Sequence, residues 1–199
     1  MNNQMAYLIG MILGNGEVQR NTSNTTITIE IPHKNLKDDE GLEVLVYVKC
    51  SLINIRDVIE PLLGHSMSIT QNKTATRISF TKPNEDYAMR EILRFIGNGV
   101  HHSTMTMNDE LFNMTTDQKK ELLRGYLNSD GYVGISKTKQ LLNIGFVSIN
   151  LELLEAIQDI LFSLGIISNM SLLRNEKTHF FGKKLCNTKK CYQLRLGHT

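Results

Sequence analysis

The sequence predicts an α+β fold of two related halves, each with its elements in the order αββαββ, the first half followed by a further helix. The main observation is an internal repeat: residues 8–16 (LIGMILGNG) and 123–131 (LRGYLNSDG) both contain two glycines six residues apart. In addition, strand-like and then helix-like patterns follow both copies in a similar order. The predicted boundaries are 1–97 for the first half, 98–115 for a linker and 116–199 for the second half.

The first half shows both kinds of periodicity after its motif. Apolar and polar residues alternate in TITIEI (26–31), as in a half-buried strand, and residues 66–71 and 75–82 form a second pair of strand candidates. A helix is predicted at INIRDVIEPLLG (53–64) between the two pairs. A second helix is predicted after the last strand, with Asn84 as its N-terminal cap.

The second half repeats this order. Its motif helix is expected to open at Thr116, and NIGFVSI (143–149) is a strand candidate. Apolar residues in LLEAIQDILFSLG (153–165) recur at helical spacing and stop at a glycine. Two further strands are predicted near 168–174 and 191–196, joined by a long basic connection.

The glycines of the repeated motif indicate close helix packing. Gly10 and Gly125 would lie inside helices, where glycine costs about 1 kcal/mol relative to alanine. If the two glycines face each other, the motif helices can pack almost backbone to backbone about a pseudo-twofold axis. Asp130 would then lie at a helix C-terminus, where its charge meets the negative end of the helix dipole. A divalent cation nearby would remove that unfavourable interaction.

Composition excludes several classes of protein. The chain has 199 residues, of which 41% are hydrophobic and 21% charged, as in a folded globular protein. It has no apolar stretch long enough for a membrane span, and its N-terminus does not resemble a secretory signal. The three cysteines (Cys50, Cys186 and Cys191) form no C-x-x-C pair, which favours an intracellular, reducing compartment and ordinary thiols over a metal site.

Positive charge is concentrated at the end of the chain. The formal net charge is only +2, but residues 171–199 carry a net charge of +6 and the remaining residues a net charge of −4. A basic segment of this kind suits a polyanionic partner. A solvated, charge-biased tail explains the same pattern equally well.

The two motif copies, LIGMILGNG and LRGYLNSDG, resemble the motifs of the monomeric LAGLIDADG homing endonucleases. The resemblance extends over nearly the whole chain, and FVSINLELLEAIQDILFSLGI (146–166) strongly resembles the family's segment after the second motif. It implies paired motif helices between the halves and a four-stranded antiparallel sheet in each half. The two sheets would form a saddle over double-stranded DNA and read bases in the major groove. It also implies a monomer that cuts a long DNA site with Mg²⁺ or another divalent cation, such as Mn²⁺ or Ca²⁺.

The resemblance places the two catalytic, metal-binding side chains at Asp130 and Asn15, with the carbonyl groups of Gly14 and Ser129 as additional ligands. Asp130 matches the family's acid, but Asn15 does not, because an amide carries no charge and binds a hard cation poorly. Three explanations stay open. Asn15 is a deliberate substitution that traps uncleaved DNA, or it is natural in an enzyme that nicks one strand. In the third explanation, cleavage is lost and binding of DNA or intron RNA is retained, as in maturases or in a regulator on the same fold.

Polar and basic side chains along the predicted strands are the candidates for DNA contact, although a sheet with a polar solvent-exposed face is the alternative. The candidates are Gln19, Arg20, Thr26, Thr28, Glu30, Gln71, Lys73, Arg77, Ser79, Lys82, Ser136, Lys137, Lys139, Ser148, Arg174, Lys177, Gln193 and Arg195. Groups that could assist at the scissile phosphates are Lys82, Lys137, Lys139, His101, His102, Ser148 and Asn150.

Overall fold

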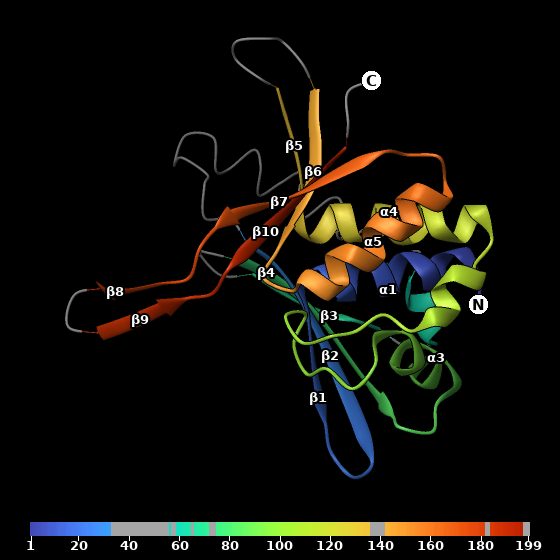
Figure 1. Ribbon diagram of the computed structural model, residues 1–199. Coiled ribbons are helices and arrows are strands. Elements are labelled where there is room, and N and C mark those ends of the chain that lie inside the picture. Colours follow the sequence, from blue (N-terminus) through green and yellow to red (C-terminus); the bar gives the residue numbers. More distant parts are fainter. Residues whose placement is uncertain are drawn as a thin grey trace.

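The computed structural model describes residues 1–32, 56, 59–64, 66–71, 75–135, 142–181 and 184–196 (Figure 1). The first half contains α1 (Asn3–Asn15), β1 (Gly16–Arg20), β2 (Asn24–Pro32), β3 (Ser68–Gln71), β4 (Ala75–Pro83) and α3 (Tyr87–Ile96). Its strands form one antiparallel sheet in the order β1-β2-β4-β3. Residues 59–63 are helical, which agrees with the prediction for the described part of 53–64.

The second half repeats this arrangement after a short 3-10 helix, η1 (Asp109–Asn113). It contains α4 (Thr116–Asp130), β5 (Gly131–Ile135), β6 (Leu142–Ser148), α5 (Leu151–Ser163), β7 (Ser168–Arg174), β8 (Lys177–Phe181), β9 (Lys184–Thr188) and β10 (Cys191–Leu196). The main sheet has the order β5-β6-β10-β7, which is the topology of the first sheet, while β8 and β9 form a separate two-stranded sheet. The predicted basic connection is therefore in part a hairpin, which its sequence did not indicate.

Helix ends follow the chemistry of their capping residues. The side chain of Thr115 accepts a hydrogen bond from the Gln118 backbone, and the Gln118 side chain accepts one from Thr115, so α4 begins at Thr116 as predicted. The cap of α3 is Asp86, not Asn84 as predicted. Asn84 is used elsewhere, because its side-chain oxygen accepts a hydrogen bond from the Thr25 hydroxyl at 2.7 Å.

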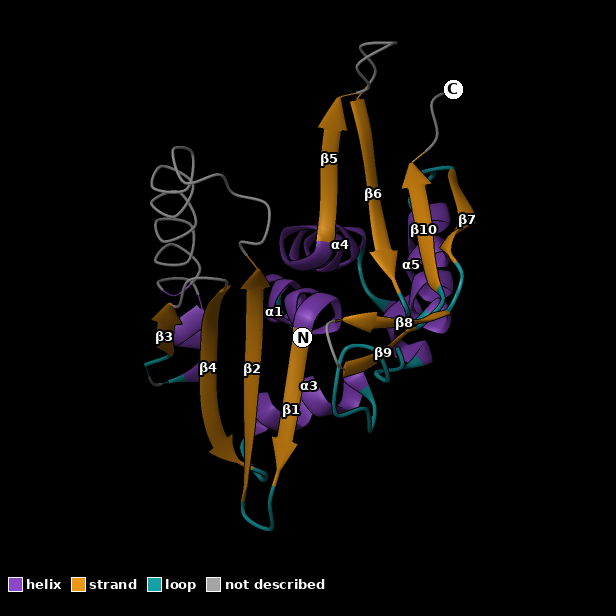
Figure 2. Cartoon of the chain, turned by 90° about the vertical axis from the view of Figure 1, so that its left-hand side faces the viewer, coloured by secondary structure: helices purple, strands orange, loops and turns teal. Residues whose placement is uncertain are grey.

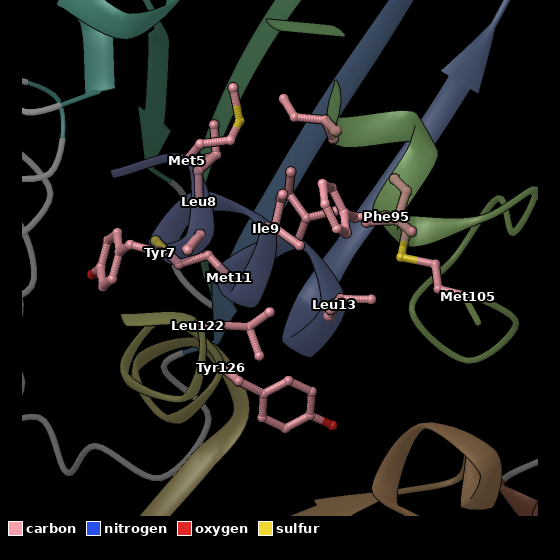
Figure 3. Close-up of a cluster of buried hydrophobic side chains, with 14 of the residues drawn as sticks. Met5, Tyr7, Leu8, Ile9, Met11, Leu13, Phe95, Met105, Leu122 and Tyr126 are labelled. Atoms are coloured by element: carbon pink, nitrogen blue, oxygen red, sulfur yellow. The ribbon is translucent and has the colours of Figure 1, made fainter. Parts of the chain in front are cut away.

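The core is centred on α1, which is buried from Met5 to Gly14. Its side chains contact α4 on one side and the β2 and α3 layer on the other (Figure 3). Leu122 and Tyr126 of α4 lie beside Met11 and Leu13, while Phe95 and Met105 enter from α3 and the linker. None of the helices in the described residues is long and apolar enough to cross a membrane.

The two main sheets extend from the paired helices in different directions (Figure 2). Each motif helix leads straight into the first strand of its sheet, α1 into β1 and α4 into β5. Residues of the linker run beside β1, where the Val18 N–H donates to the Val100 carbonyl and the His102 N–H donates to the Gly16 carbonyl. The fold thus places both helix C-termini between the two sheets.

Candidate active site

The two motif helices meet through their glycines, as predicted. A Cβ atom added to Gly10 would collide with the Leu122 carbonyl oxygen and lie 2.9 Å from the Tyr126 nitrogen. A Cβ atom added to Gly125 would collide with the Tyr7 carbonyl oxygen and lie 3.0 Å from the Met11 nitrogen. The two contacts are equivalent, because they join corresponding positions of the two motif copies. The helices are therefore in direct backbone contact about a pseudo-twofold axis.

The same contact brings the two motif ends together. Gly14 lies against Ser129, whose hydroxyl occupies the place that a side chain on Gly14 would need. The Ser129 hydroxyl donates to the Tyr126 carbonyl at 3.1 Å, which fixes its position in the interface. Asn15 and Asp130 are the next residues along the two helices, so they stand at neighbouring helix C-termini.

Asn15 is tied to the sheet of the first half. Its side-chain N–H group donates to the Glu30 carbonyl of β2. The amide therefore presents only its neutral oxygen to an approaching ligand. Asn15 also lies at the inner end of a polar cavity of about 350 Å³ on the outer face of the first sheet. The other lining residues are Gly16, Glu17, Gln19, Thr28, Glu30, Thr70, Arg77, Ser79 and His101.

Asp130 has no such partner. The residue is only partly exposed, and its carboxylate makes no hydrogen bond or ion pair with any residue that the structure describes. Burial raises the pKa of Asp130 to about 7, because the charged carboxylate is removed from water without compensation. A carboxylate of this kind at a helix C-terminus is positioned to bind a cation.

The surroundings of Asp130 are apolar or weakly polar. Tyr126, one helical turn earlier, is completely buried, and its hydroxyl lies near Ser148 without a hydrogen bond of normal geometry within the described chain. Burial and the negative charge of Asp130 both raise the pKa of Tyr126. The Cys191 thiol is also close enough for Asp130 to raise its pKa, although burial is the larger cause.

Strand register gathers most of the predicted DNA-contacting residues of the first half on one face. Thr26, Thr28, Glu30, Arg77 and Ser79 alternate with buried residues along β2 and β4 and all point away from the helices. Gln19 joins them on β1. Some side chains on this polar face already pair with one another. Arg77 forms an ion pair with Glu30 at 2.6 Å, and the hydroxyls of Thr26 and Thr81 are hydrogen-bonded at 2.8 Å.

Two basic candidates lie on the opposite face of this sheet from the other candidates. Arg20 is opposite the buried Thr25 and donates to the Gly97 carbonyl at 2.9 Å. Lys82 also pairs with Thr25 and forms an ion pair with Asp86 at 2.7 Å. Because side chains alternate between faces with a period of two, neither residue faces the polar cavity. Gln71 ends β3 opposite Thr76.

In the second sheet two of the candidates are buried. Ser148 is 4% exposed, and its hydroxyl accepts a hydrogen bond from the Asn150 N–H on the core side. Gln193 is 7% exposed and donates to the Tyr132 hydroxyl. Arg195, Arg174 and Lys177 are exposed. The candidates Lys73, Ser136, Lys137 and Lys139 lie outside the described residues.

The linker contributes two histidines with different surroundings. His101 lines the polar cavity, and its Nδ1 lies 3.0 Å from the Ser103 hydroxyl. His102 is half-buried, and burial together with the neighbouring His101 lowers its pKa to about 4, so it is neutral at pH 7. Asn150 holds this segment in place, because its amide donates to the carbonyls of His102 and Met105 at 3.1 and 2.7 Å. Asn150 therefore has a structural partner and does not approach the cavity.

Sequence reasoning missed part of the cavity wall. Glu17 and Thr70 line the cavity beside the predicted residues, and Tyr126 forms the buried wall next to Asp130. Only strand register could have found Thr70, because its strand is paired with β4 and lies far from the motif in the sequence.

Comparisons with known proteins agree with this geometry. Residues 117–191 match the sequence profile of the LAGLIDADG-like domain. No curated protein sequence matches the chain significantly. Among solved structures, a variant of I-DmoI in complex with its target DNA in the presence of manganese superimposes with a TM-score of 0.59 and 16% identity, over 98% of this chain and 87% of that one.

Two further structures extend the comparison. I-DmoI in complex with DNA and calcium gives a TM-score of 0.57 and 15% identity, over 98% of this chain and 83% of that one. Full-length DUF199/WhiA from Thermatoga maritima gives 0.52 and 12%, over 98% of this chain and 50% of that one. These likenesses confirm the predicted α+β fold of two related halves.

Proposed function

This chain contains a LAGLIDADG-like domain and has the LAGLIDADG fold over both halves, and from this premise we propose that it is a site-specific DNA endonuclease of the homing type. It acts as a monomer on a long duplex site. The outer faces of its sheets enter the major groove. Hydrolysis depends on a divalent cation held at the Asp130 end of the helix pair, so that one DNA strand is cut.

The observation that carries this proposal is the uncompensated carboxylate of Asp130, at a helix C-terminus next to that of Asn15, which lines the polar cavity. A partly buried charge without a partner is costly unless a counter-charge arrives from outside the chain. The relatives I-DmoI are crystallised with DNA together with manganese or calcium. A bound divalent cation would supply charge neutralisation at the phosphate and a bound water of lowered pKa.

The residues of this chain fit such a cation unequally. Asp130 offers a charged oxygen, and the carbonyl groups of Gly14 and Ser129 stand one residue before the two motif ends. Tyr126 keeps water away from the inner side of Asp130. Asn15 offers one neutral oxygen, because its nitrogen donates to Glu30. The Asp130 end therefore holds a hard cation better than the Asn15 end.

Duplex DNA suits the outer face because that face presents exposed donors and acceptors. Gln19 and Arg77 are side-chain types that pair with adenine and guanine edges in the major groove, and Thr28 and Ser79 add hydroxyls between them. The ion pair of Arg77 with Glu30 would open when a base edge replaces the carboxylate. An exposed ion pair is worth less than about 1 kcal/mol, so this exchange is inexpensive.

The test begins with finding a site. Duplexes that the protein retains are selected from a randomised pool, and the enriched sequence is placed in a supercoiled plasmid. We expect Mg²⁺ or Mn²⁺ to convert this plasmid to the nicked circle, and Asp130→Asn to stop the conversion while binding to the selected duplex persists. If the wild-type protein binds its site but produces no metal-dependent break, the endonuclease proposal fails.

The uncharged Asn15 favours a second candidate, a non-cleaving nucleic-acid-binding protein on the same fold, such as an intron maturase or a regulator. Its amide is held by β2 and contributes no charge to a second metal site. Structured intron RNA and the selected duplex, offered in competition, separate the two candidates. Tight RNA binding without retention of duplex DNA would favour the maturase.

A further inference from the structure

The two halves differ at the connection between their last two sheet strands. In the first half, residues 72–74 join β3 to the central strand β4, and in the second half residues 175–190 join the equivalent strands β7 and β10. This longer connection contains β8 and β9, which pair with each other in a sheet of their own. The hairpin is thus an addition to one half that the shared fold does not need.

The hairpin projects from the side of the molecule that carries the polar sheet face. In Figure 1 it extends away from α1, α4 and α5, and in Figure 2 it stands in front of the space between the two main sheets. Its strands contain five residues each, so at about 3.3 Å per residue it reaches about 16 Å beyond its base. That length exceeds the width of the DNA major groove, which is about 12 Å.

The base of the hairpin is fixed. The Thr188 hydroxyl accepts a hydrogen bond from the Lys177 N–H at 3.2 Å and donates to the Lys177 carbonyl at 3.1 Å. Lys177 also pairs with Thr188 in the strand register. The two strands of the hairpin are therefore held together at its base, and less conformational freedom is lost when a ligand binds it.

The hairpin segment is strongly basic and its charges are available. Residues 174–190 contain six lysines and arginines against one acid, Glu176. Lys177, Lys189 and Lys190 are exposed and form no ion pair with any residue the structure describes. Some cations elsewhere are already paired: Lys82 with Asp86, and Arg124 with Glu121. Cations without partners gain most from a polyanion.

We propose that residues 175–190, the segment that contains β8 and β9, form a basic arm that binds the phosphate backbone of duplex DNA lying on the two sheets. This inference rests on the proposed function, because it needs a duplex on the polar face. Lysines act as point charges and read no bases, so the arm adds affinity and positions the duplex without adding sequence preference. Only the second half has the arm, so it also gives the complex a direction along the DNA.

The test uses the full chain and a mixed-sequence duplex of about 40 base pairs, with dissociation constants measured by fluorescence anisotropy over a range of salt concentrations. The variant Lys177→Ala/Lys189→Ala/Lys190→Ala removes three exposed charges. We expect it to lower the slope of log affinity against log salt by about 3 and to weaken binding to all duplexes alike. The control Arg90→Ala/Lys119→Ala/Lys120→Ala removes the same charge from α3 and α4 and should leave the slope near that of the wild type.

Each outcome separates the arm from the proposed function. If the wild-type protein binds no duplex at all, the proposed function fails. If it binds and the arm variant matches the control variant, the arm proposal alone fails. A loss confined to structured RNA would also overturn the arm as a DNA-binding element. A second variant replaces residues 175–190 with the sequence QNKT (71–74), which removes five lysines and adds one. It should lower the slope by at least as much as the triple variant, with thermal unfolding as the check on folding.

Discussion

The two motif ends occupy equivalent places in the fold and differ in chemistry. Asn15 and Asp130 both end a helix at a glycine with an extended backbone, and each helix continues directly into the first strand of its sheet. Asn15 is an amide hydrogen-bonded to β2, whereas Asp130 is an acid that is partly buried and without a partner among the described residues. Backbone packing sets the symmetry of this site, so the side chains are free to make it chemically asymmetric.

The largest effect on stability is expected at the glycine contact between the two motif helices. Gly10→Ala and Gly125→Ala should each lower the free energy of unfolding by about 3 kcal/mol or more, because the new methyl group meets backbone atoms that cannot rotate away. Urea denaturation measures both. Gly64→Ala is the control. Its Cβ would meet open space, so only the positive φ of 69° should destabilise the fold, by about 1–2 kcal/mol. Clearly unequal effects at Gly10 and Gly125 would contradict the reciprocal contact.

The next change restores the charge at the first motif end. Asn15→Asp should convert nicking of the selected plasmid into double-strand cleavage and raise the rate of linear product by about 100-fold, because a second charged oxygen becomes available to a cation. The ratio of linear to nicked plasmid over time is the measurement. Asn15→Ser, which adds no charge, should leave the plasmid nicked. An unchanged product ratio with aspartate would mean that position 15 does not limit cleavage.

Asp130 should oppose folding at high pH when no cation is bound. The pKa of Asp130 is about 7 in the folded chain and near 3.8 in the unfolded chain. Stability from this group is therefore complete below about pH 4 and is lost as the pH rises through 7. Asp130→Asn should be more stable than the wild type by about 3 kcal/mol at pH 8 and equally stable at pH 4.

Urea unfolding of both proteins at the two pH values measures this difference. Adding Ca²⁺ should narrow it at pH 8, because the cation stabilises only the wild type. A wild-type protein that is more stable than Asp130→Asn at pH 8 without metal would show that the carboxylate has a partner.

The smallest expected effect concerns the segment that joins the halves. His102 donates its N–H to Gly16 in the first half and accepts from Asn150 in the second. Its folded pKa of about 4 lies below the usual 6.5, so its contribution is present above pH 6.5 and is lost as the pH falls towards 4. Between these values the wild type should lose a few degrees of Tm more than His102→Gln. If the Tm of the two proteins fell equally between these pH values, His102 would already be charged in the folded chain.

Much of this fold was predictable because its signals are local. The Gly spacing predicted the helix pair, alternation predicted β2, and helical periodicity predicted α5. The hairpin β8–β9 was missed because its strands pair only with each other and belong to neither main sheet. The sequence did not show on which face Arg20 and Lys82 lie, because strand side chains have a period of two and the face depends on the neighbours with which a strand pairs.

The sequence by itself determined that the chain is duplicated, that both helices approach through glycine, and that one motif end is an amide and the other an acid. Only the tertiary structure decided what those two groups experience. Glu30 of β2 takes up the Asn15 nitrogen, and Tyr126 and Cys191 surround Asp130 without neutralising it. Residue identity is a local property of the chain, whereas burial and hydrogen-bond partners come from segments that meet only when the sheets close around the helix pair.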